Sequence, residues 1–368
     1  ELAAPDGYVT DQEPQEFTFE YQGSGTSVAE YAFTFEDEQT TVELSKADLT
    51  DKKELPGASL KVTDEDGNTV DEWVSKEEAH IIKGLIVGKK YKMTETKPAD
   101  GYVTAESIEF TVENTKEVQK HQMLDDVTKV EISKKDITDS SEVPGAKMII
   151  LDKDGKKVES WTSTDKPHMV KKLPVGKYTL REEQAPDGYL IAEDVKFTVK
   201  DTGKVQKVKM KDAHPYGKLV IKKTDSTSKA ALPGAEFELR EKESGEVVEK
   251  LVTDKTGTAT SGKIPIATYK NGKVEKTVEY ILVETKAPNG YELSSKKEEI
   301  RFEYKDGKTK VIEIVKEIKN TKSPSGSTPT GNSPKTGDST NIWLPILLAV
   351  LSACGIGGVI WYKKKKGN

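Results

Sequence analysis

The chain has 368 residues, of which 34% are hydrophobic and 33% charged, and its formal net charge is −6. The length allows two or three ordinary domains, but so few apolar residues leave each domain only a small core. The charge shows no basic patch of the kind that nucleic-acid binding requires, and the single cysteine, Cys354, excludes a disulfide as the staple of a small domain.

Three segments of similar pattern follow one another from residue 40, after a shorter first segment. Each begins with a strand whose alternate residues are apolar and end in a lysine. Because alternate residues of a strand share a face, this lysine is predicted to point into the core. We therefore expect complete modules at 40–127, 128–215 and 216–321, and the C-terminal part of a truncated module at 1–39. The rows are Val42/Leu44/Lys46, Val130/Ile132/Lys134 and Leu219/Ile221/Lys223.

Two further strands of each module carry polar residues on the same inward face. One ends in a glutamate and the last ends in an aspartate or asparagine. Between the first two complete modules the lysine moves by 88 positions (46 to 134), and the glutamate and aspartate each move by 87 (95 to 182, 125 to 212), so the register is kept. The sets are Lys46/Glu95/Asp125, Lys134/Glu182/Asp212 and Lys223/Glu284/Asn320, and the truncated module keeps Glu1 and Asp37.

Short alternating strands separated by turn residues predict an all-β fold. Each module is expected to be a small two-sheet, Greek-key-like β-sandwich. The third module has a longer lysine-to-glutamate interval (223 to 284), with the extra residues around Thr253 to Thr277. We predict a hairpin pair there, which is either a binding loop or an elaboration of the domain. Trp73 and Trp161 occupy matching positions and are predicted to anchor the cores.

A lysine buried with a carboxyl or carboxamide group beside a glutamate can condense into an amide bond. Burial disfavours both charged forms, which leaves a neutral amine facing a protonated acid. We expect Lys134 to attack Asp212 with loss of water while Glu182 shuttles protons, and the third module to release ammonia because Asn320 replaces the aspartate. The alternative is a buried ion triad without a bond. Each condensation occurs once, so the protein is not predicted to be an enzyme.

The predicted catalytic residues are therefore the three glutamates, and the predicted crosslinks join the first and last strands of each module. In the first complete module Asp126 competes with Asp125 for the facing position. The four histidines are far apart in sequence, and Asp64 to Asn68 lacks the later ligands of a calcium loop, so neither a metal nor a cofactor is predicted.

The C-terminus predicts a membrane anchor. Residues 322–332 are rich in Ser, Thr, Pro and Gly and are expected to form an extended linker. Residues 342–362 are an apolar run of about 32 Å as a helix, long enough to span a bilayer. The lysines at 363–366 place that end in the cytoplasm and the upstream chain outside. A plain tail-anchored membrane protein is one interpretation.

The segment 333–368 also resembles the sortase signal of Gram-positive surface proteins. It combines a P-x-T-G pentapeptide, an apolar span and a basic tail. The resemblance implies that a sortase cuts between Thr336 and Gly337 and joins the threonine to the peptidoglycan cell wall, after a membrane-associated precursor stage. The pentapeptide is Ser333, Pro334, Lys335, Thr336 and Gly337, with serine where the common pattern has leucine.

The modules resemble SpaA-like, prealbumin-fold domains, also called collagen-adhesin B-type domains. The resemblance rests on YTLREEQAPDGY (178–189), YILVETKAPNGY (280–291), the weaker match YKMTETKPADGY (91–102), and LPGA or VPGA after each lysine. It implies transthyretin-like sandwiches that form internal isopeptide bonds. The chain opens with ELAAPDGY, inside the same motif, so we expect it to be the C-terminal part of a longer protein.

These observations predict a secreted, cell-wall-anchored stalk or adhesin on the cell surface. Its expected partners are a sortase and the wall, with a host matrix protein as partner of an upstream region. Two alternatives remain: an ancillary pilin subunit, and the stalk of a surface enzyme whose catalytic domain lies upstream. The absence of a YPK-type lysine motif argues against a backbone pilin.

Overall fold

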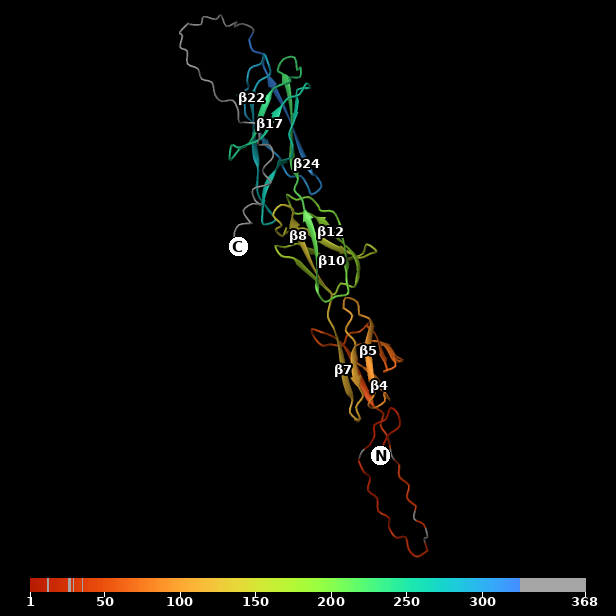
Figure 1. The fold of residues 1–368 in the computed structure, drawn as a ribbon. Coiled ribbons are helices and arrows are strands. Elements are labelled where there is room, and N and C mark those ends of the chain that lie inside the picture. The colour runs from red at the N-terminus through yellow and green to blue at the C-terminus, as the bar shows by residue number, and fades with distance from the viewer. Residues whose placement is uncertain (12, 26–27, 29, 35, 325–368) are drawn as a thin grey trace, which may run out of the picture. The chain divides into compact units, whose positions relative to one another are not determined.

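The computed structural model describes residues 1–324, apart from residues 12, 26–27, 29 and 35. Its regular structure consists of strands β1 to β24, all within the unit Glu1–Ser323. The strands divide into three modules: the first complete module is β1–β7, the second is β8–β14 and the third is β15–β24 (Figure 1). The predicted all-β class is therefore confirmed for this part of the chain.

The first module is built from a three-stranded sheet, ordered β4-β1-β7, and a four-stranded sheet, ordered β3-β2-β5-β6. The first strand β1 runs antiparallel to β4 and parallel to the last strand β7. The bounds are β1 (Thr41–Asp48), β2 (Ser59–Thr63), β3 (Thr69–Val74), β4 (His80–Lys83), β5 (Lys90–Lys97), β6 (Ile108–Thr111) and β7 (Gln119–Asp125).

The second module repeats this arrangement strand for strand. Its sheets are ordered β11-β8-β14 and β10-β9-β12-β13, and β8 is parallel to β14. The bounds are β8 (Lys129–Asp136), β9 (Lys147–Leu151), β10 (Lys157–Thr162), β11 (His168–Lys171), β12 (Gly176–Gln184), β13 (Val195–Val199) and β14 (Val205–Asp212).

The third module keeps both sheets and adds strands. In one sheet β15 pairs with β18, β19 and, in parallel, β24; the other is ordered β17-β16-β22-β23, and β20-β21 is a separate hairpin. The extra residues around Thr253 to Thr277, which were predicted to form a hairpin pair, thus form β18, β19 and this hairpin. The bounds are β15 (Tyr216–Asp225), β16 (Glu236–Glu241), β17 (Val247–Val252), β18 (Thr258–Thr260), β19 (Ile264–Pro265), β20 (Ala267–Lys270), β21 (Lys273–Thr277), β22 (Glu279–Lys286), β23 (Glu298–Arg301) and β24 (Val311–Asn320).

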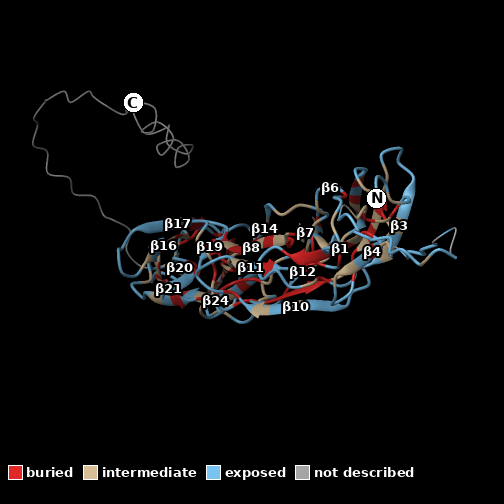
Figure 2. Ribbon diagram, turned by 90° about the horizontal axis from the view of Figure 1, so that it is seen from below, coloured by how far each residue is buried: buried red, intermediate tan, exposed pale blue. Residues whose placement is uncertain are grey.

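Each module has its own apolar core between its two sheets. Figure 2 shows the buried residues in red on the inner strands, whereas β3, β10 and β17, which end their four-stranded sheets, are mostly exposed. Trp73 and Trp161 are partly buried against these cores, and each stacks on a histidine, His80 and His168, with ring centroids 4.2 and 4.3 Å apart. The predicted anchoring tryptophans therefore form the edge of the core rather than its centre.

Residues 1–39 contain no named strand among their described residues; an isolated bridge joins Tyr8 to Gln39. Among the described residues we find no helix long and apolar enough to cross a membrane. The predicted sortase signal at 333–368, with its helix at 342–362, lies outside the described residues.

Candidate functional site

Parallel pairing of the first and last strands brings the predicted lysine and its partner together in each module. In the second module, Lys134 pairs with Met210 in the β8–β14 register, so Asp212 lies two residues further along the adjacent strand on the same face. Glu182 comes from β12 in the opposite sheet and completes the group from across the core. All three predicted residues of this set therefore meet at one end of the sandwich.

The group in the second module is buried and closely packed. Lys134 Nζ contacts Asp212 Oδ1 and lies 2.9 Å from Glu182 Oε2. The side chain of Lys134 is 3% exposed, and those of Glu182 and Asp212 are fully buried. Glu182 Oε1 and Asp212 Oδ2 are buried without a hydrogen-bond partner among the described residues. An ionised Asp212 carboxylate lacks there the donors that it would have in water, which favours its protonated form.

The other two modules repeat this geometry. Lys46 Nζ lies 3.0 Å from Glu95 Oε1 and contacts Asp125 Oδ1. Asp126, the competing residue, instead forms an ion pair with Lys129 at 2.7 Å, so Asp125 is the partner that faces the core lysine.

In the third module the amide of Asn320 takes the place of the carboxyl. Lys223 Nζ contacts Asn320 Oδ1 and lies 2.9 Å from Glu284 Oε1. The Asn320 Nδ2 group donates to both oxygens of Glu284, at 3.0 and 3.1 Å. Glu284 therefore touches both the attacking nitrogen and the nitrogen that would leave.

The electrostatics of the three sites follow from burial. Desolvation raises the pKa of Asp125 and of Asp212 to about 7, although the neighbouring lysine pulls in the other direction and the glutamate adds to the rise. Desolvation likewise lowers the pKa of Lys223, against the opposing effect of Glu284. Protonated acids and a neutral amine are the forms that condensation requires.

A backbone group that sequence reasoning missed orients each glutamate. The amide N–H of the residue ten positions later donates to Oε2 of the glutamate: Ala105 to Glu95 at 2.6 Å, Ala192 to Glu182 at 2.7 Å and Ser294 to Glu284 at 2.9 Å. The constant interval was the signal that could have identified this contact.

A second recurring set was also missed. Two residues after each core lysine stands an aspartate that accepts a hydrogen bond from the tyrosine of the D/N-G-Y turn, at 2.7 to 2.8 Å. Burial raises the pKa of Asp136, but donors including Thr138, Tyr189 and His214 outweigh it and hold the pKa at about 2. Asp212, in the same module, has the opposite shift because there desolvation outweighs the effect of its donor Lys134. The pairs are Asp48/Tyr102, Asp136/Tyr189 and Asp225/Tyr291.

The described residues of the segment 1–39 form no such site. Glu1 is exposed and accepts a hydrogen bond from Asp11 N at 3.0 Å, while Asp37 is half-buried. No hydrogen bond or ion pair joins Glu1 to Asp37 in the part of the chain that the structure describes. The described residues also hold no group of three His, Cys, Asp or Glu side chains that could bind a metal ion.

Comparison with known proteins identifies one family. The model of the SpaA prealbumin-like fold domain matches residues 40–126, 128–214 and 217–318. No curated protein matches the chain.

The chain is also similar to solved structures of other bacterial proteins. The Bacillus anthracis TIE protein is 28% identical over 77% of this chain, with a TM-score of 0.52. The chain spans only about half of that protein, 51% of its length. The major pilin BcpA of Bacillus cereus is 18% identical over 77% of this chain and 99% of its own, with a TM-score of 0.46. The major pilin SpaD of Corynebacterium diphtheriae is 19% identical over 79% and 99%, with a TM-score of 0.37.

Proposed function

Since the chain belongs to the SpaA family of prealbumin-like fold domains, we propose that it is a surface stalk whose three complete modules are each closed by an intramolecular isopeptide bond. The observation that carries the proposal is the buried lysine, which contacts an acid or amide on the last strand and a glutamate from the opposite sheet, in three modules alike. A bond at this place joins the first strand to the last, so pulling on the two ends of a module loads a covalent link.

The condensation balances within each group of three residues. In the second module, Lys134 Nζ forms a bond to Asp212 Cγ as Glu182 takes a proton from the nitrogen. Glu182 returns that proton to the departing Asp212 oxygen, the C–O bond breaks and water leaves. In the third module the same steps deliver the proton to Asn320 Nδ2, and ammonia leaves. Contact distances of 2.9 to 3.0 Å from each glutamate to the lysine suit this transfer.

A buried ion triad without a bond is the competing interpretation. Removing an ion pair from water costs several kcal/mol per charge, and the unpartnered oxygen of Asp212 leaves part of that cost uncompensated. Condensation removes both charges, which favours the bond over the triad.

The experiment is an intact mass of the full chain, expressed in a host without sortase and purified in detergent. We expect the mass to fall below the sequence mass by two waters and one ammonia. Replacing Glu182 by Gln, which keeps the size of the side chain, restores one water and leaves the other two losses. A mass equal to that of the sequence would contradict the proposal.

Anchoring to the wall is a separate part of the proposal. It rests on the pentapeptide 333–337, the apolar run 342–362 and the lysines that follow. Replacing Thr336 by Ala should move the protein from the cell-wall fraction to the membrane or the medium. Native protein found only in the membrane with its lysine tail intact would contradict sortase anchoring. That result would leave the bonds within the modules untouched.

A further inference from the structure

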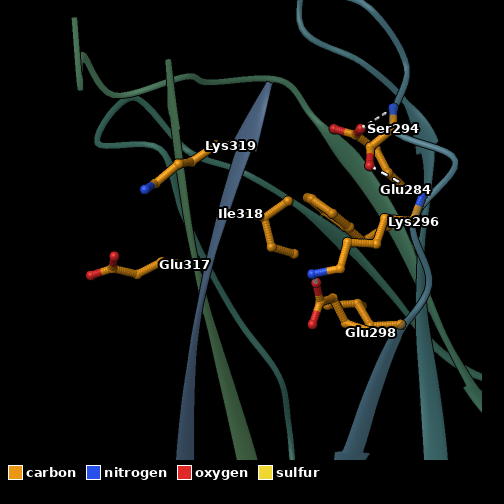
Figure 3. Close-up of a pocket in the computed structure, with 9 residues that line it drawn as sticks. Glu284, Ser294, Lys296, Glu298, Glu317, Ile318 and Lys319 are labelled. Carbon is orange, nitrogen blue, oxygen red and sulfur yellow. Dashed lines mark hydrogen bonds and ion pairs between the residues drawn. The ribbon is translucent and has the colours of Figure 1, made fainter. Parts of the chain in front are cut away.

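The third module has a cavity beside its candidate site that reaches the catalytic glutamate. Its volume is about 300 Å³, and Glu284 forms part of its wall. Figure 3 shows Ile318 facing Lys296 and Glu298 from the opposite side, with Glu284 beyond them and bonded to the Ser294 amide. Lys296 Nζ and Glu298 Oε1 are 2.5 Å apart. The cavity thus has an apolar side next to the core and charged groups elsewhere in its wall.

Strand register shows why this site differs from the others. In the first module the inward residue Ile108 of β6 pairs with Met93. In the second module the equivalent residue is Val195 of β13, which pairs with Leu180. Both pack against their cores. In β23 the same position, paired with Leu282, is Glu298. An apolar side chain that packs against the core in two modules is therefore replaced by a charged one in the third.

The neighbouring position on the last strand changes as well. The residue that pairs with the core lysine is Met123 or Met210 in the first two modules, and each is 1% exposed. In the third module it is Ile318, which is shorter and only half-buried. The two residues that differ, Ile318 and Glu298, both line the cavity. They belong to the module in which the lysine faces Asn320 and not an aspartate.

The two leaving groups make different demands on such a site. Water is a poor nucleophile toward an amide, so a water molecule left beside the new bond does little harm. Ammonia is a neutral amine and attacks the same carbonyl, which regenerates Asn320 and free Lys223. Protonation to ammonium removes that reactivity. Release into solvent, past the carboxylates of Glu298 and Glu317, therefore drives the third reaction forward.

We propose that this cavity is the exit route of ammonia from the third module, kept open by Ile318 and Glu298. The inference rests on the proposed isopeptide chemistry and adds a specific role for two residues that take no part in the bond. The leaving nitrogen of Asn320 already lies against Glu284, which forms part of the cavity wall, so the path from the reacting atoms to solvent is short.

The test closes the route with residues that the other modules already use. The full chain with Ile318→Met and Glu298→Val is made by cell-free synthesis and denatured at intervals. The peptide that links Lys223 to Asn320 is then measured against time by mass spectrometry. We expect it to form several-fold more slowly than in the wild type, while the Lys134–Asp212 peptide forms at an unchanged rate. An unchanged rate for the Lys223–Asn320 peptide would overturn the inference.

A reciprocal pair of variants in the second module provides a test if the Ile318→Met, Glu298→Val variant fails to fold. Asp212→Asn makes the second module release ammonia past Met210 and Val195 instead of Ile318 and Glu298, and we expect its bond to form slowly. Adding Met210→Ile and Val195→Glu should restore much of the rate. Fast condensation by Asp212→Asn alone would overturn the exit route, whereas no linked peptide in the wild type would refute the proposed function itself.

Discussion

The second and third modules hold the same three groups in the same register but surround them differently. In the second, Met210 and Val195 pack against the core at the neighbouring positions and the partner is an acid. In the third, Ile318 and Glu298 line an open cavity beside Glu284 and the partner is an amide. The comparison shows that strand register decides which side chains meet, whereas side chains next to the group decide what can leave it.

The largest effect is expected when the glutamates of the two modules are replaced one at a time. Glu182→Ala and Glu284→Ala should each abolish only the bond of their own module. The lost crosslinks close loops from 134 to 212 and from 223 to 320, which on the chain-entropy estimate for disulfides are worth about 4.5 and about 4.7 kcal/mol. We expect the affected module to melt earlier and to become open to trypsin.

Dithiothreitol is the control for this prediction, because a peptide-like bond is indifferent to reductant. Calorimetry and trypsin digestion of both variants should give unchanged results with and without it. If Glu284→Ala also prevents the bond in the second module, the two sites are not independent and the comparison fails.

The second prediction concerns pH in chains that cannot form one bond. In Glu182→Gln, desolvation keeps the pKa of Asp212 well above the 3.8 of an exposed aspartate, so the folded module binds an extra proton. Its stability is fully present below about pH 4 and falls by up to a few kcal/mol as the pH rises to about 7. Calorimetry of the earliest melting transition measures this.

The third module should respond with the opposite sign. It has Asn320 instead of an acid, and burial lowers the pKa of Lys223 from 10.5. The unlinked module in Glu284→Gln therefore gains stability as the pH rises toward 10.5. Equal pH responses of the two unlinked modules would show that the acid and the amide are not what distinguishes them.

The triads could be predicted from the sequence because a period of two residues fixes which face a strand residue occupies. Val130, Ile132 and Lys134 had to share a face, and the constant offsets between modules located the partners. Choosing between Asp125 and Asp126 needed the observed strand β7, which turns Asp125 inward.

Other features were out of reach for physical reasons. The cavity is lined by residues of different strands, such as Ile318 of β24 and Glu298 of β23. The pattern of a single strand does not show which residues of other strands lie beside it. The extra hairpin around residues 253–277 was predicted, but its contact with the second module was not. Tyr269 on β20 stacks on His214 of that module, with ring centroids 3.4 Å apart. Long-range contacts between loops leave no periodic signal. The aspartate–tyrosine pairs did leave one, because each aspartate stands two residues after the core lysine and each tyrosine seven residues after the glutamate.

The third prediction compares equivalent glycines in the turn after each glutamate. Gly188 and Gly290 both have positive φ, +88° and +82°, so alanine costs each about 1–2 kcal/mol in backbone strain. A Cβ on Gly188 would lie 2.3 Å from Val274 Cγ2 of the β20–β21 hairpin, whereas a Cβ on Gly290 has no neighbour within 4 Å among the described residues. Gly188→Ala should therefore cost a further 1–3 kcal/mol, roughly.

Thermal unfolding of the two alanine variants measures that difference, and Val274→Ala provides the matched control. Combined with Gly188→Ala, the smaller side chain should recover most of the additional loss. Equal destabilisation by Gly188→Ala and Gly290→Ala would mean that the hairpin moves away without cost.

The smallest expected effect comes from the hydroxyl group of Tyr269. It donates to the carbonyl oxygen of Gly188 at 2.8 Å, and Phe keeps the ring that stacks on His214. Tyr269→Phe should therefore cost about 1 kcal/mol, the net value of one hydrogen bond, and should leave the stacking in place. Tyr280→Phe is the matched control, because that hydroxyl donates to Pro265 within the third module. Amide exchange near Gly188 should rise in the Tyr269 variant and stay unchanged in the control. Equal exchange in both variants would show that the hairpin does not stabilise the turn of the second module.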